Sequence, residues 1–439
     1  MKKVVKFGGS SLANAEQFQK VGDIIRSDES RRYVVPSAPG KRFDEDIKVT
    51  DMLYGCYDAA SKGEDITEKI NAIKARYYEI IKGLGLSLSL EEEFKKIDED
   101  FRAQAGIQYA ASRGEFLNGK IMAAYLGYDF VDAASVIRFD KVGNLEAEET
   151  NKLLSKKLSK SQHAVIPGFY GACADGTVKT FSRGGSDVTG SLVAKAIHAD
   201  IYENWTDVSG FLVTDPRIVH NPEPIEAITY RELRELSYMG ATVLHEDAIF
   251  PVRAAGIPVN IKNTNCPQDR GTMIVSETAE PCEHIITGIA GKKGMSVINI
   301  EKDKMNSEVG FGRNVLRALE KSNVSFEHMP SGVDTMSVVI QTDKLAGKET
   351  TILDEIRSRV HPDQLYIESN LALIAVVGRG MKSARGTAAI LFTALADARV
   401  NIKMIDQGSS ELNIIIGVAE EDFEVAMKAI YNAFIKVKK

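Results

Sequence analysis

The chain has few of the residues that build metal centres, disulfide frameworks and membrane spans. Its four cysteines, Cys56, Cys173, Cys266 and Cys282, are scattered over 439 residues and form no CxxC pair. This usage is typical of reduced thiols in a cytoplasmic protein. None of the seven histidines forms an H-x-x-x-H or H-x-H pair or lies near a G-x-S-x-G motif. The sequence therefore supports neither metal-bound water nor a Ser-His-Asp triad, and no metal-ligating residue is predicted.

Long apolar runs and an excess of charge of one sign are also missing. No apolar stretch approaches the roughly 20 residues that cross a bilayer, and the one after Met1 is too short for a signal peptide. The formal net charge is −6, with 55 Lys and Arg against 61 Asp and Glu. This balance gives no support for a nucleic-acid or membrane partner. Hydrophobic residues make up 44% of the chain, enough for a large core in two or three domains.

The first part of the chain is predicted to be α/β. Apolar segments that end in small residues, at 2–9 and 31–40, read as strands, and a helical pattern lies between them at 14–28. Residues 51–125 are mostly helical in pattern, and further strands are expected later. Strand, helix and strand in this order predict a parallel sheet with its function at the carboxyl edge. We expect an αβα sandwich that extends to about residue 285.

The last third of the chain contains an internal repeat. A shift of 76 positions (386 − 310) aligns Met305 with Met381, Gly310 with Gly386, Val324 with Val400 and Gly332 with Gly408. Both copies read as strand, glycine loop, helix, strand, glycine turn and strand, followed by another amphipathic helix. This predicts two α+β units of the βαββαβ kind, which bind ligands or mediate assembly more often than they serve packing alone.

A glycine-rich turn follows the first strand. Lys6 precedes Gly8, Gly9, Ser10 and Ser11, and a helical pattern comes next. Backbone N–H groups that lead into a helix N-terminus favour an anion, although the sequence is not a P-loop. On this motif alone, an ordinary turn with a solvated lysine is the alternative.

A second glycine turn carries Arg183, Gly184, Gly185, Ser186 and Asp187 ahead of another helical pattern. Arginine suits forked recognition of a carboxylate, so the two turns together suggest two bound anionic groups. Asp187 would be costly as an isolated charge, and an ion pair with Lys6 would relieve this cost. The alternative for Asp187 is a plain helix cap.

Two more polar stretches admit two interpretations each. Glu115 lies among small residues at an expected helix start, where a capping role is slightly preferred from the residues alone. Thr206 and Asp207 end a strand, and Asp215 and Arg217 form a turn soon after it. These groups suit either a bound nucleotide or simple turn formation.

Taken in order, these stretches resemble the aspartokinases of the amino acid kinase family along essentially the whole chain. The matching motifs are KFGGSS, SAPGKRFDEDIKVTD, SRGE, GFYG, SRGGSD, WTDVSGFLVTDPR and VLHEDAIFP. Two segments that look like ACT domains follow them. The resemblance implies a catalytic domain at 1–285 and a regulatory region at 286–439, with ACT units at about 296–370 and 371–439. Whether the two units share strands is left open.

The resemblance also implies an activity. The family uses Mg-ATP to phosphorylate the side-chain carboxylate of L-aspartate, giving 4-phospho-L-aspartate and ADP, the first step toward lysine, threonine and methionine. A carboxylate is already ionised at pH 7, which agrees with the lack of a poised general base. An amino-acid effector, lysine by preference, is expected at the ACT units of a homodimer or dimer of dimers. The rival interpretations are a sibling amino acid kinase and an amino-acid sensor with a degenerate kinase domain.

Residue roles follow from the resemblance alone. Lys6 corresponds to the lysine at the transferring phosphate, and Asp187 to the acid that organises it. Glu115 corresponds to the residue that takes the substrate ammonium. The remaining aspartate-pocket positions are Ser37, Thr50, Arg183, Gly184 and Ser186. The remaining ATP-site positions are Gly8, Gly9, Ser10, Thr206, Asp207, Leu212, Asp215, Arg217, Thr242 and Val243.

This chain departs from the family pattern at two nucleotide positions. Thr242 stands where many aspartokinases have a lysine, and Leu212 stands where a tyrosine is frequent. The sequence therefore has one cation fewer for ATP, for which Arg217 or Lys262 would compensate. These departures affect the expected ATP affinity and leave the expected reaction unchanged.

The effector pocket is expected in the first ACT unit. The candidates are Met305, Gly310, Ser325, Phe326 and Glu327. An acid at position 327 would suit an effector with a basic side chain, which is the reason for preferring lysine. Gly310 is equally well explained as a turn glycine.

Overall fold

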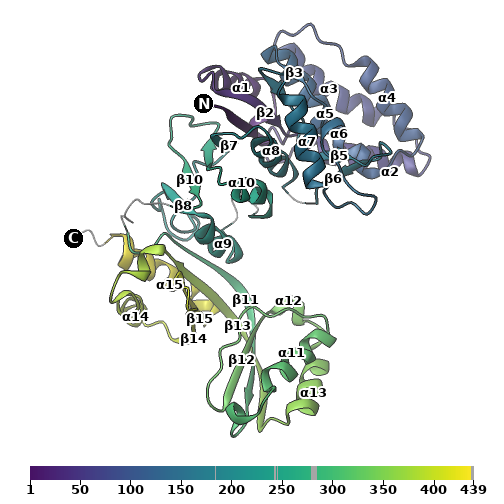
Figure 1. Ribbon diagram of the computed structural model, residues 1–439. Helices are drawn as coiled ribbons and strands as arrows, with labels where there is room; N and C mark the ends of the chain where they lie inside the picture. Colours follow the sequence, from purple (N-terminus) through teal and green to yellow (C-terminus); the bar gives the residue numbers. More distant parts are fainter. Residues whose placement is uncertain (183, 242–243, 245, 278–283, 437–439) are drawn as a thin grey trace. The chain divides into compact units, whose positions relative to one another are not determined.

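A computed structural model describes residues 1–182, 184–241, 244, 246–277 and 284–436. The chain divides into two compact units (Figure 1). The two units are named after the roles that the resemblance implies. The catalytic unit comprises Met1–Phe211, Pro224–Tyr230 and Val243–Thr278. The regulatory unit comprises Leu212–Glu223, Arg231–Thr242 and Ala279–Lys439. Arg183, Thr242 and Val243, three of the predicted site residues, lie outside the described residues.

The catalytic unit is built on an eight-stranded sheet of order β3-β4-β2-β1-β7-β9-β10-β8. All neighbouring strands are parallel except β9 and β10, which are antiparallel. A separate hairpin joins β5 (Tyr170–Ala172) and β6 (Val178–Thr180). The strands of the sheet are β1 (Lys3–Phe7), β2 (Arg31–Pro36), β3 (Asp129–Phe130), β4 (Ala164–Val165), β7 (Ile201–Thr206), β8 (Ala227–Thr229), β9 (Val259–Asn263) and β10 (Thr272–Val275).

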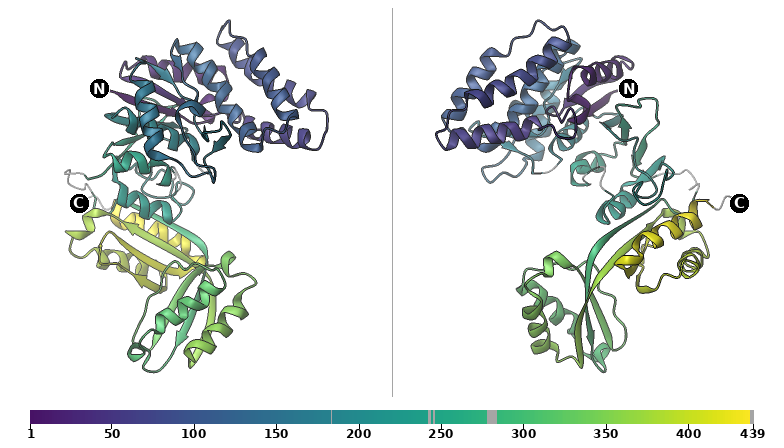
Figure 2. Two further views of the ribbon diagram at one scale, coloured as in Figure 1. Left: turned by 45° about the vertical axis from the view of Figure 1, so that its right-hand side comes forward. Right: turned by 180° about the vertical axis from the view of Figure 1, so that it is seen from behind.

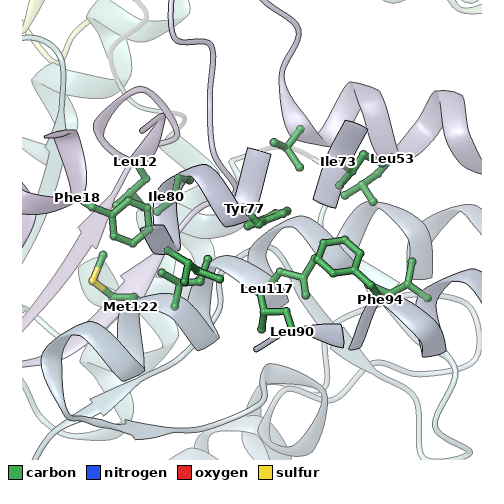
Figure 3. Packing of buried hydrophobic residues seen from close by; sticks show 14 of the residues in the cluster. Leu12, Phe18, Leu53, Ile73, Tyr77, Ile80, Leu90, Phe94, Leu117 and Met122 are labelled. Atoms are coloured by element: carbon green, nitrogen blue, oxygen red, sulfur yellow. The ribbon is translucent and has the colours of Figure 1, made fainter. Parts of the chain in front are cut away.

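Helices flank this sheet, and their apolar faces form its main core. Buried side chains of α1 to α5 pack with Val5, Phe7 and Trp205 of the central strands. Figure 3 shows this packing around Phe18, Tyr77 and Leu117. The helices of the unit are α1 (Ala15–Arg26), α2 (Val49–Ser61), α3 (Thr67–Gly83), α4 (Glu91–Arg102), α5 (Ile107–Leu126), α6 (Ala133–Val136), α7 (Ala147–Leu158), α8 (Gly185–Ala196) and α10 (Phe250–Ala254), with 3-10 turns η1 (Ser10–Leu12) and η2 (Glu246–Ile249).

The alternation of β1 decides which side chain faces the site. Val5 and Phe7 point into the helical core, so Lys6 points to the opposite face of the sheet, where α8 lies. β1 sits between β2 and β7, and Lys6 is in register with Asn204 of β7. Lys6 is thus held near the carboxyl end of a central, buried strand.

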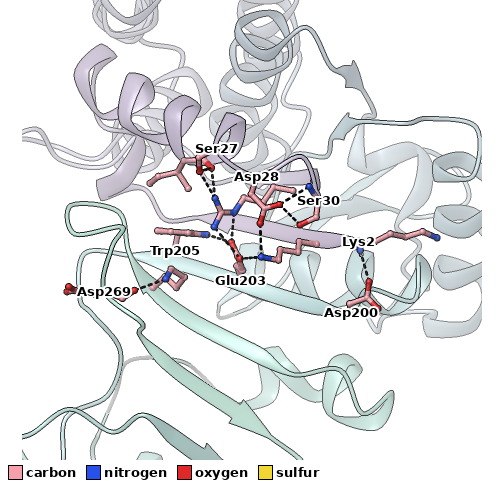
Figure 4. A network of polar contacts seen from close by, with 12 residues as sticks. Lys2, Ser27, Asp28, Ser30, Asp200, Glu203, Trp205 and Asp269 are labelled. Carbon is pink, nitrogen blue, oxygen red and sulfur yellow. Dashed lines mark hydrogen bonds and ion pairs between the residues drawn. The ribbon is translucent and has the colours of Figure 1, made fainter.

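A polar network stiffens the opposite face of the same strands (Figure 4). Buried Glu203 accepts hydrogen bonds from Trp205 Nε1 at 2.9 Å and from Arg31 Nε at 2.8 Å. Lys3 Nζ lies 3.1 Å from the same carboxylate. A buried carboxylate needs such partners, and here they fix β7 against β1 and β2 directly behind the site.

The regulatory unit contains one five-stranded antiparallel sheet of order β12-β11-β13-β15-β14. Its two longest strands, β11 and β13, have 14 residues each and pair along their length (Figures 1 and 2). Its elements are α9 (Tyr230–Tyr238, of which 231–238 belong here), β11 (Gly288–Glu301), η3 (Met305–Ser307), α11 (Phe311–Lys321), β12 (Thr335–Gln341), α12 (Thr342–Leu345), α13 (Glu349–Val360), β13 (Gln364–Val377), η4 (Arg379–Lys382), α14 (Thr387–Asp397), β14 (Ile402–Asp406), β15 (Asn413–Ala419), η5 (Glu420–Asp422), α15 (Phe423–Tyr431) and a final turn (Asn432–Lys436).

The predicted repeat is present in this sheet. Met305 and Met381 are both buried in short 3-10 turns, and Gly310 and Gly386 precede α11 and α14 with φ of +85° and +86°. The two copies are not separate, because β11 and β13 each run through both of them. One half of each long strand pairs in the first copy and the other half in the second.

The observed architecture confirms the predicted fold class, an α/β kinase-type domain followed by βαββαβ units. The domain boundaries inferred from the sequence stay predictions. A search of the described helices finds none whose length and apolar character would let it span a bilayer.

Candidate active site

Lys6 and Asp187 form the ion pair that the sequence predicted. Lys6 Nζ lies 2.6 Å from Asp187 Oδ1, and the Lys6 side chain is largely buried. Asp187 sits in the first turn of α8, so it reaches Lys6 across the sheet face. A buried lysine paired in this way presents a fixed positive charge rather than a mobile one. Asp187 therefore does more than cap a helix.

Asn204 is a site residue that sequence reasoning missed. Its amide Nδ2 donates to Asp187 Oδ1 at 2.8 Å, and its Oδ1 accepts a 3.4 Å hydrogen bond from Lys6 Nζ. It is buried in β7 directly beside Lys6. The available signal was a lone amide inside the apolar strand IYENWT, where an unpartnered side chain would be costly. Asn204 completes a closed cluster with the ion pair.

The first glycine turn differs from the expectation in two ways. The Gly8 N–H donates to the Trp205 carbonyl at 3.0 Å, and the Ser11 N–H donates to the Gly8 carbonyl at 3.1 Å. Two of the four expected anion-binding amides are thus already used within the chain. The turn also enters the 3-10 turn η1 before α1 begins, and Asn14 caps α1 by accepting from the Gln17 N–H at 2.9 Å. The α1 dipole is therefore one step further away than predicted.

The space around this turn differs between its two glycines. A Cβ on Gly8 would meet only the Trp205 carbonyl oxygen at 3.7 Å and Lys6 Nζ at 3.9 Å, so the region beside the ammonium is open. A Cβ on Gly9 would lie 2.9 Å from the Ala38 carbonyl oxygen, closer than van der Waals contact allows. Gly9 must therefore be glycine for the next loop to approach.

Glu115 lies in the middle of α5, eight residues after its first residue, so the capping interpretation is wrong. The side chain is buried, and its Oε2 has no hydrogen-bond partner among the described residues. Burial raises the pKa of Glu115 to about 8, although the Ala38 N–H and the Arg113 guanidinium favour the charged form. A buried carboxylate with an oxygen that lacks a hydrogen-bond partner suits a cationic ligand group.

Two of the other predicted aspartate-pocket positions, Ser37 and Thr50, lie close to the part of α5 that carries Glu115. Asn118 of α5 donates to the Ser37 carbonyl at 2.6 Å, and Thr50 lies in the first turn of α2. A Cβ on Gly114 would meet the Ala38 Cβ at 2.8 Å and Thr50 Oγ1 at 3.9 Å. Positions 37, 50 and 115 therefore share one neighbourhood, and their role as an aspartate pocket stays a prediction.

The second glycine turn is described from Gly184 onward. Gly184 has φ of +55°, a left-handed conformation that favours glycine, and α8 follows. Ser186 is buried against Gly168 of the GFYG segment, where a Cβ would lie 2.5 Å from Ser186 Oγ. The two motifs are thus in direct contact.

The predicted nucleotide residues fall in both units. Thr206 ends β7 in the catalytic unit, and its hydroxyl donates to Asp207 at 3.1 Å. In the regulatory unit, Asp215 and the exposed Arg217 form a 2.6 Å ion pair with each other, which lowers the pKa of Asp215. Leu212 of the same segment is partly exposed. Their local geometry is that of a turn, and their nucleotide role stays a prediction.

Lys262 does not replace the lysine missing at position 242. It is in register with Trp205, one residue beyond Asn204, so it faces the side of the sheet opposite to Lys6. Its Nζ donates to the Asp269 carbonyl at 2.6 Å and lies 5.3 Å from the centre of the Trp205 ring. This lysine belongs to the packing behind the site.

The predicted effector residues all belong to the first copy of the repeat. Met305 is buried, Gly310 is the left-handed residue before α11, and Phe326 is exposed. Ser325 Oγ accepts a hydrogen bond from Lys344 at 3.1 Å. The Glu327 carboxylate is buried, and its ammonium neighbours are Lys292 Nζ at 2.9 Å and Lys344 Nζ at 3.6 Å.

Comparison with known proteins places this geometry in a family. The model of the amino acid kinase family matches residues 1–263, and an ACT domain model matches residues 374–434. Aspartokinase 3 of Bacillus subtilis (strain 168) is 40% identical over 449 residues, which cover 98% of both chains. The crystal structure of Clostridium acetobutylicum aspartate kinase has a TM-score of 0.94 at 54% identity, covering 98% of this chain and 100% of that one.

Escherichia coli aspartokinase III provides two further structures. One is in complex with aspartate and ADP (R-state), with a TM-score of 0.74 at 25% identity over 99% of both chains. The other is in complex with lysine and aspartate (T-state), with a TM-score of 0.75 at 26% identity over 98% of this chain and 99% of that one. The chain belongs to the amino acid kinase family. Within that family it is an aspartate kinase.

Proposed function

We propose that this aspartate kinase transfers the terminal phosphoryl group of ATP to the side-chain carboxylate of L-aspartate. A carboxylate oxygen forms the new bond to phosphorus, the bond to the bridging oxygen of ATP breaks, and ADP leaves. No proton has to be removed from the acceptor at neutral pH. The observation that carries the proposal is the buried Glu115 carboxyl group, one oxygen of which has no partner among the described residues. The Ala38 N–H, which donates to this carboxyl group, belongs to the loop that also contacts Gly9.

Lys6 and the glycine turn supply the phosphate side of the reaction. Catalysis of phosphoryl transfer depends on alignment and on neutralising charge at the phosphoryl oxygens. Lys6 is fixed by Asp187 and Asn204, and the open space next to Gly8 leaves its ammonium accessible to a phosphate. Asp187 and Asn204 thus act by orienting Lys6. Thr206, Asp207, Leu212, Asp215 and Arg217 keep the nucleotide role implied by the resemblance.

Glu115 supplies the aspartate side. The substrate ammonium would satisfy its open oxygen and return its pKa toward the usual range. An acetylated substrate has no ammonium and would leave this buried carboxylate unpaired. The site therefore favours a free amino acid. The resemblance to the family implies that Ser37, Thr50, Gly184 and Ser186 line the pocket and that Arg183 binds the substrate α-carboxylate.

Magnesium would accompany ATP. Mg²⁺ is usually held through phosphate oxygens and water with one or two carboxylates, and its role is to neutralise phosphate charge. No group of three or more His, Cys, Asp or Glu side chains suited to a metal occurs in the described part of the chain.

An amino-acid end product would inhibit the enzyme at the regulatory unit. The E. coli protein captured with lysine in its T-state supports lysine as the effector. The resemblance to the family implies that the effector binds at an interface between the ACT units of a homodimer or dimer of dimers. Glu327 is already paired with two lysines, so a basic effector would have to displace one of them. We place the reaction at the first step toward lysine, threonine and methionine.

ADP release with Mg-ATP and L-aspartate, measured with and without lysine, tests both parts of the proposal. Wild-type protein is expected to turn over and to be inhibited by lysine. Lys6→Ala should lower kcat by about 10³-fold or more, because a preorganised cation at the transferring phosphate is lost. Circular dichroism should show the variant folded.

Normal kcat in Lys6→Ala would refute the catalytic role of this lysine. Wild-type protein that binds an amino acid but never releases ADP would favour the sensor interpretation instead. Turnover with threonine and not lysine as inhibitor would leave the kinase proposal standing and reject the effector assignment.

A further inference from the structure

A buried arginine outside the catalytic cluster holds the loop between β2 and α2. Arg76 lies in the middle of α3 and is only 5% exposed. Its Nη1 lies 2.6 Å from Asp46 Oδ2, and its Nη2 donates to the Gly40 carbonyl at 3.0 Å. One guanidinium thus holds both ends of the segment 40–46. Its planar fork holds these two partners at a fixed spacing and orientation, which the single ammonium of a lysine does not reproduce.

Asp46 is tied down from a second side. Arg42 donates to it from its backbone N–H at 2.9 Å and from its Nε at 3.0 Å. These hydrogen bonds, with Arg76 adding to them, hold the pKa of Asp46 well below its usual range. The carboxylate therefore stays charged at neutral pH, and the pair with Arg76 persists.

Gly40 connects the Arg76 contact to the first glycine turn, which contains Gly9. Its N–H donates to the Gly9 carbonyl at 2.8 Å. A Cβ on Gly40 would lie 2.6 Å from the Gly9 carbonyl carbon. The two backbones meet with no room for a side chain, so the position of Gly40 fixes the position of Gly9.

The same loop also reaches the aspartate side. The Ala38 N–H, two residues before Gly40, donates to the Glu115 carboxylate. The Ser37 carbonyl accepts from Asn118. A shift of Gly40 would therefore move a phosphate-side backbone and a substrate-side hydrogen bond together.

We propose that Arg76, through its bonds to Asp46 and the Gly40 carbonyl, is a positioning residue that aligns the ATP turn with the Glu115 pocket. The proposal rests on the function proposed above. Arg76 contacts neither substrate, and it acts through the backbone of the loop. Alignment of two bound reactants accounts for a large share of catalysis, so a small shift of this loop should lower kcat even where the fold survives.

The test uses Arg76→Met, Arg76→Lys and Asp46→Asn in the full chain, with Arg102→Met as the matched control. Arg102 pairs with Asp98 at 3.0 Å on the exposed face of α4 and contacts no part of the loop. We expect Arg76→Met to lower kcat about 30-fold and to raise KM for aspartate and ATP together. Arg76→Lys should recover part of the loss, and Arg102→Met should match wild type.

We call the contacts of Arg76 with Asp46 and with the Gly40 carbonyl the clamp. The variants Arg76→Met and Arg76→Met/Asp46→Asn should have equal kcat, because Arg76→Met alone already removes both contacts. Should Arg76→Met not fold, Arg76→Lys and Asp46→Asn carry the test. Folded Arg76 variants with kcat and both KM values within twofold of wild type would overturn the proposal. The proposal would also be overturned if adding Asp46→Asn to Arg76→Met lowered kcat further by the full factor that Asp46→Asn causes alone.

Amide hydrogen exchange provides a readout that does not depend on turnover. Arg76→Lys should lose protection in residues 8–12 and 37–41 relative to Arg102→Met. A wild-type protein inactive on aspartate would refute the proposed reaction, whereas unchanged exchange at 8–12 would refute the clamp. The two failures are therefore distinguishable.

Discussion

Glu115 in the catalytic unit and Glu232 and Glu327 in the regulatory unit are buried carboxylates in opposite circumstances. Glu115 has an oxygen without a partner among the described residues, and burial raises its pKa to about 8. Glu232 on α9 accepts from the Thr287 hydroxyl, from the Arg379 N–H at 2.9 Å and from the Arg379 guanidinium at 3.0 Å. Despite its burial, Glu327 has a lowered pKa, because Tyr238 and Lys292 donate to it.

The difference distinguishes a binding site from a contact that holds elements of the chain together. We call the contact between Glu232 and Arg379 the joint. A buried carboxyl group without a partner is mostly protonated near neutral pH until a cationic group pairs with it, whereas a buried carboxylate paired within the chain holds elements together. α9 carries both Glu232 and Tyr238, so it is bound to the second ACT copy at its start and to the first copy at its end.

The repeat shows how the joint arose at one position. The backbone N–H of Asp303 in the first copy donates to Asp363 at 2.8 Å, within that copy. The equivalent N–H, 76 residues later (379 − 303), belongs to Arg379 and donates to Glu232 of α9. The second copy thus uses a carboxylate from outside the repeat where the first uses its own.

Among changes to these buried carboxylates, replacing the Glu115 carboxylate with a neutral amide should have the largest effect. Glu115→Gln keeps the shape and removes the charge that would meet the substrate ammonium. We expect KM for aspartate to rise about 100-fold, as for loss of one partner in a buried charged pair, with KM for ATP nearly unchanged. Steady-state kinetics with each substrate varied in turn will check this. An equal rise in both KM values would contradict a role specific to aspartate.

The same carboxylate should make aspartate use depend on pH. Only the ionised form binds the ammonium, so kcat/KM for aspartate should rise about tenfold from pH 7 to 8.5. Since the folded pKa lies above the unfolded value, folding stability contributed by Glu115 falls as pH rises from about 4.5 toward 8. Glu115→Gln should show neither trend. A flat wild-type profile would reject the raised pKa.

Opening the joint should cost stability rather than substrate affinity. Glu232→Gln places an NH₂ group near the Arg379 guanidinium and removes its counter-charge, so unfolding free energy should fall by about 2 kcal/mol. Urea denaturation followed by circular dichroism measures this. KM for aspartate in the folded variant should match wild type, in contrast with Glu115→Gln. An unchanged urea midpoint would show that the contact contributes nothing.

The two glycine caps offer the smallest and most symmetric test. Gly310→Ala and Gly386→Ala should each destabilise by about 1 kcal/mol, because φ near +85° is unfavourable for alanine. A Cβ at either site meets no atom closer than 3.9 Å, so only backbone strain is involved. Gly55→Ala, inside α2 with open space around it, should stabilise instead. Unequal losses of unfolding free energy in the two variants would show that the two copies are not equivalent at this position.

Much of the catalytic unit could be predicted because its signals are local. Lys6 and Asp187 each needed a partner of opposite charge, and this requirement was enough to predict their ion pair. Glu115 was misplaced because the small residues before it mark no helix start, and α5 begins at Ile107. Asn204 and Arg76 belong to no motif. The amide inside the apolar strand IYENWT indicates a buried partner without saying which one, and an arginine in an amphipathic helix reads as an ordinary surface position.

The regulatory unit was predictable as a repeat but not as a single sheet. Aligned glycines and methionines identify two copies, yet they carry no information on which strands pair between them. β11 and β13 join the copies through backbone hydrogen bonds, which any apolar strand can form. The sharing of strands therefore has no signature in the side chains.

The shared strands have a consequence for how the regulatory unit melts. Neither copy contains a complete sheet of its own. Cutting the chain between residues 370 and 371 would divide β13 and would leave residues 288–292 of β11 without their strand partners. A fragment of the second copy alone would expose a bare strand edge and tend to aggregate. Calorimetry of the intact unit should accordingly give one heat-absorption peak for both copies rather than two.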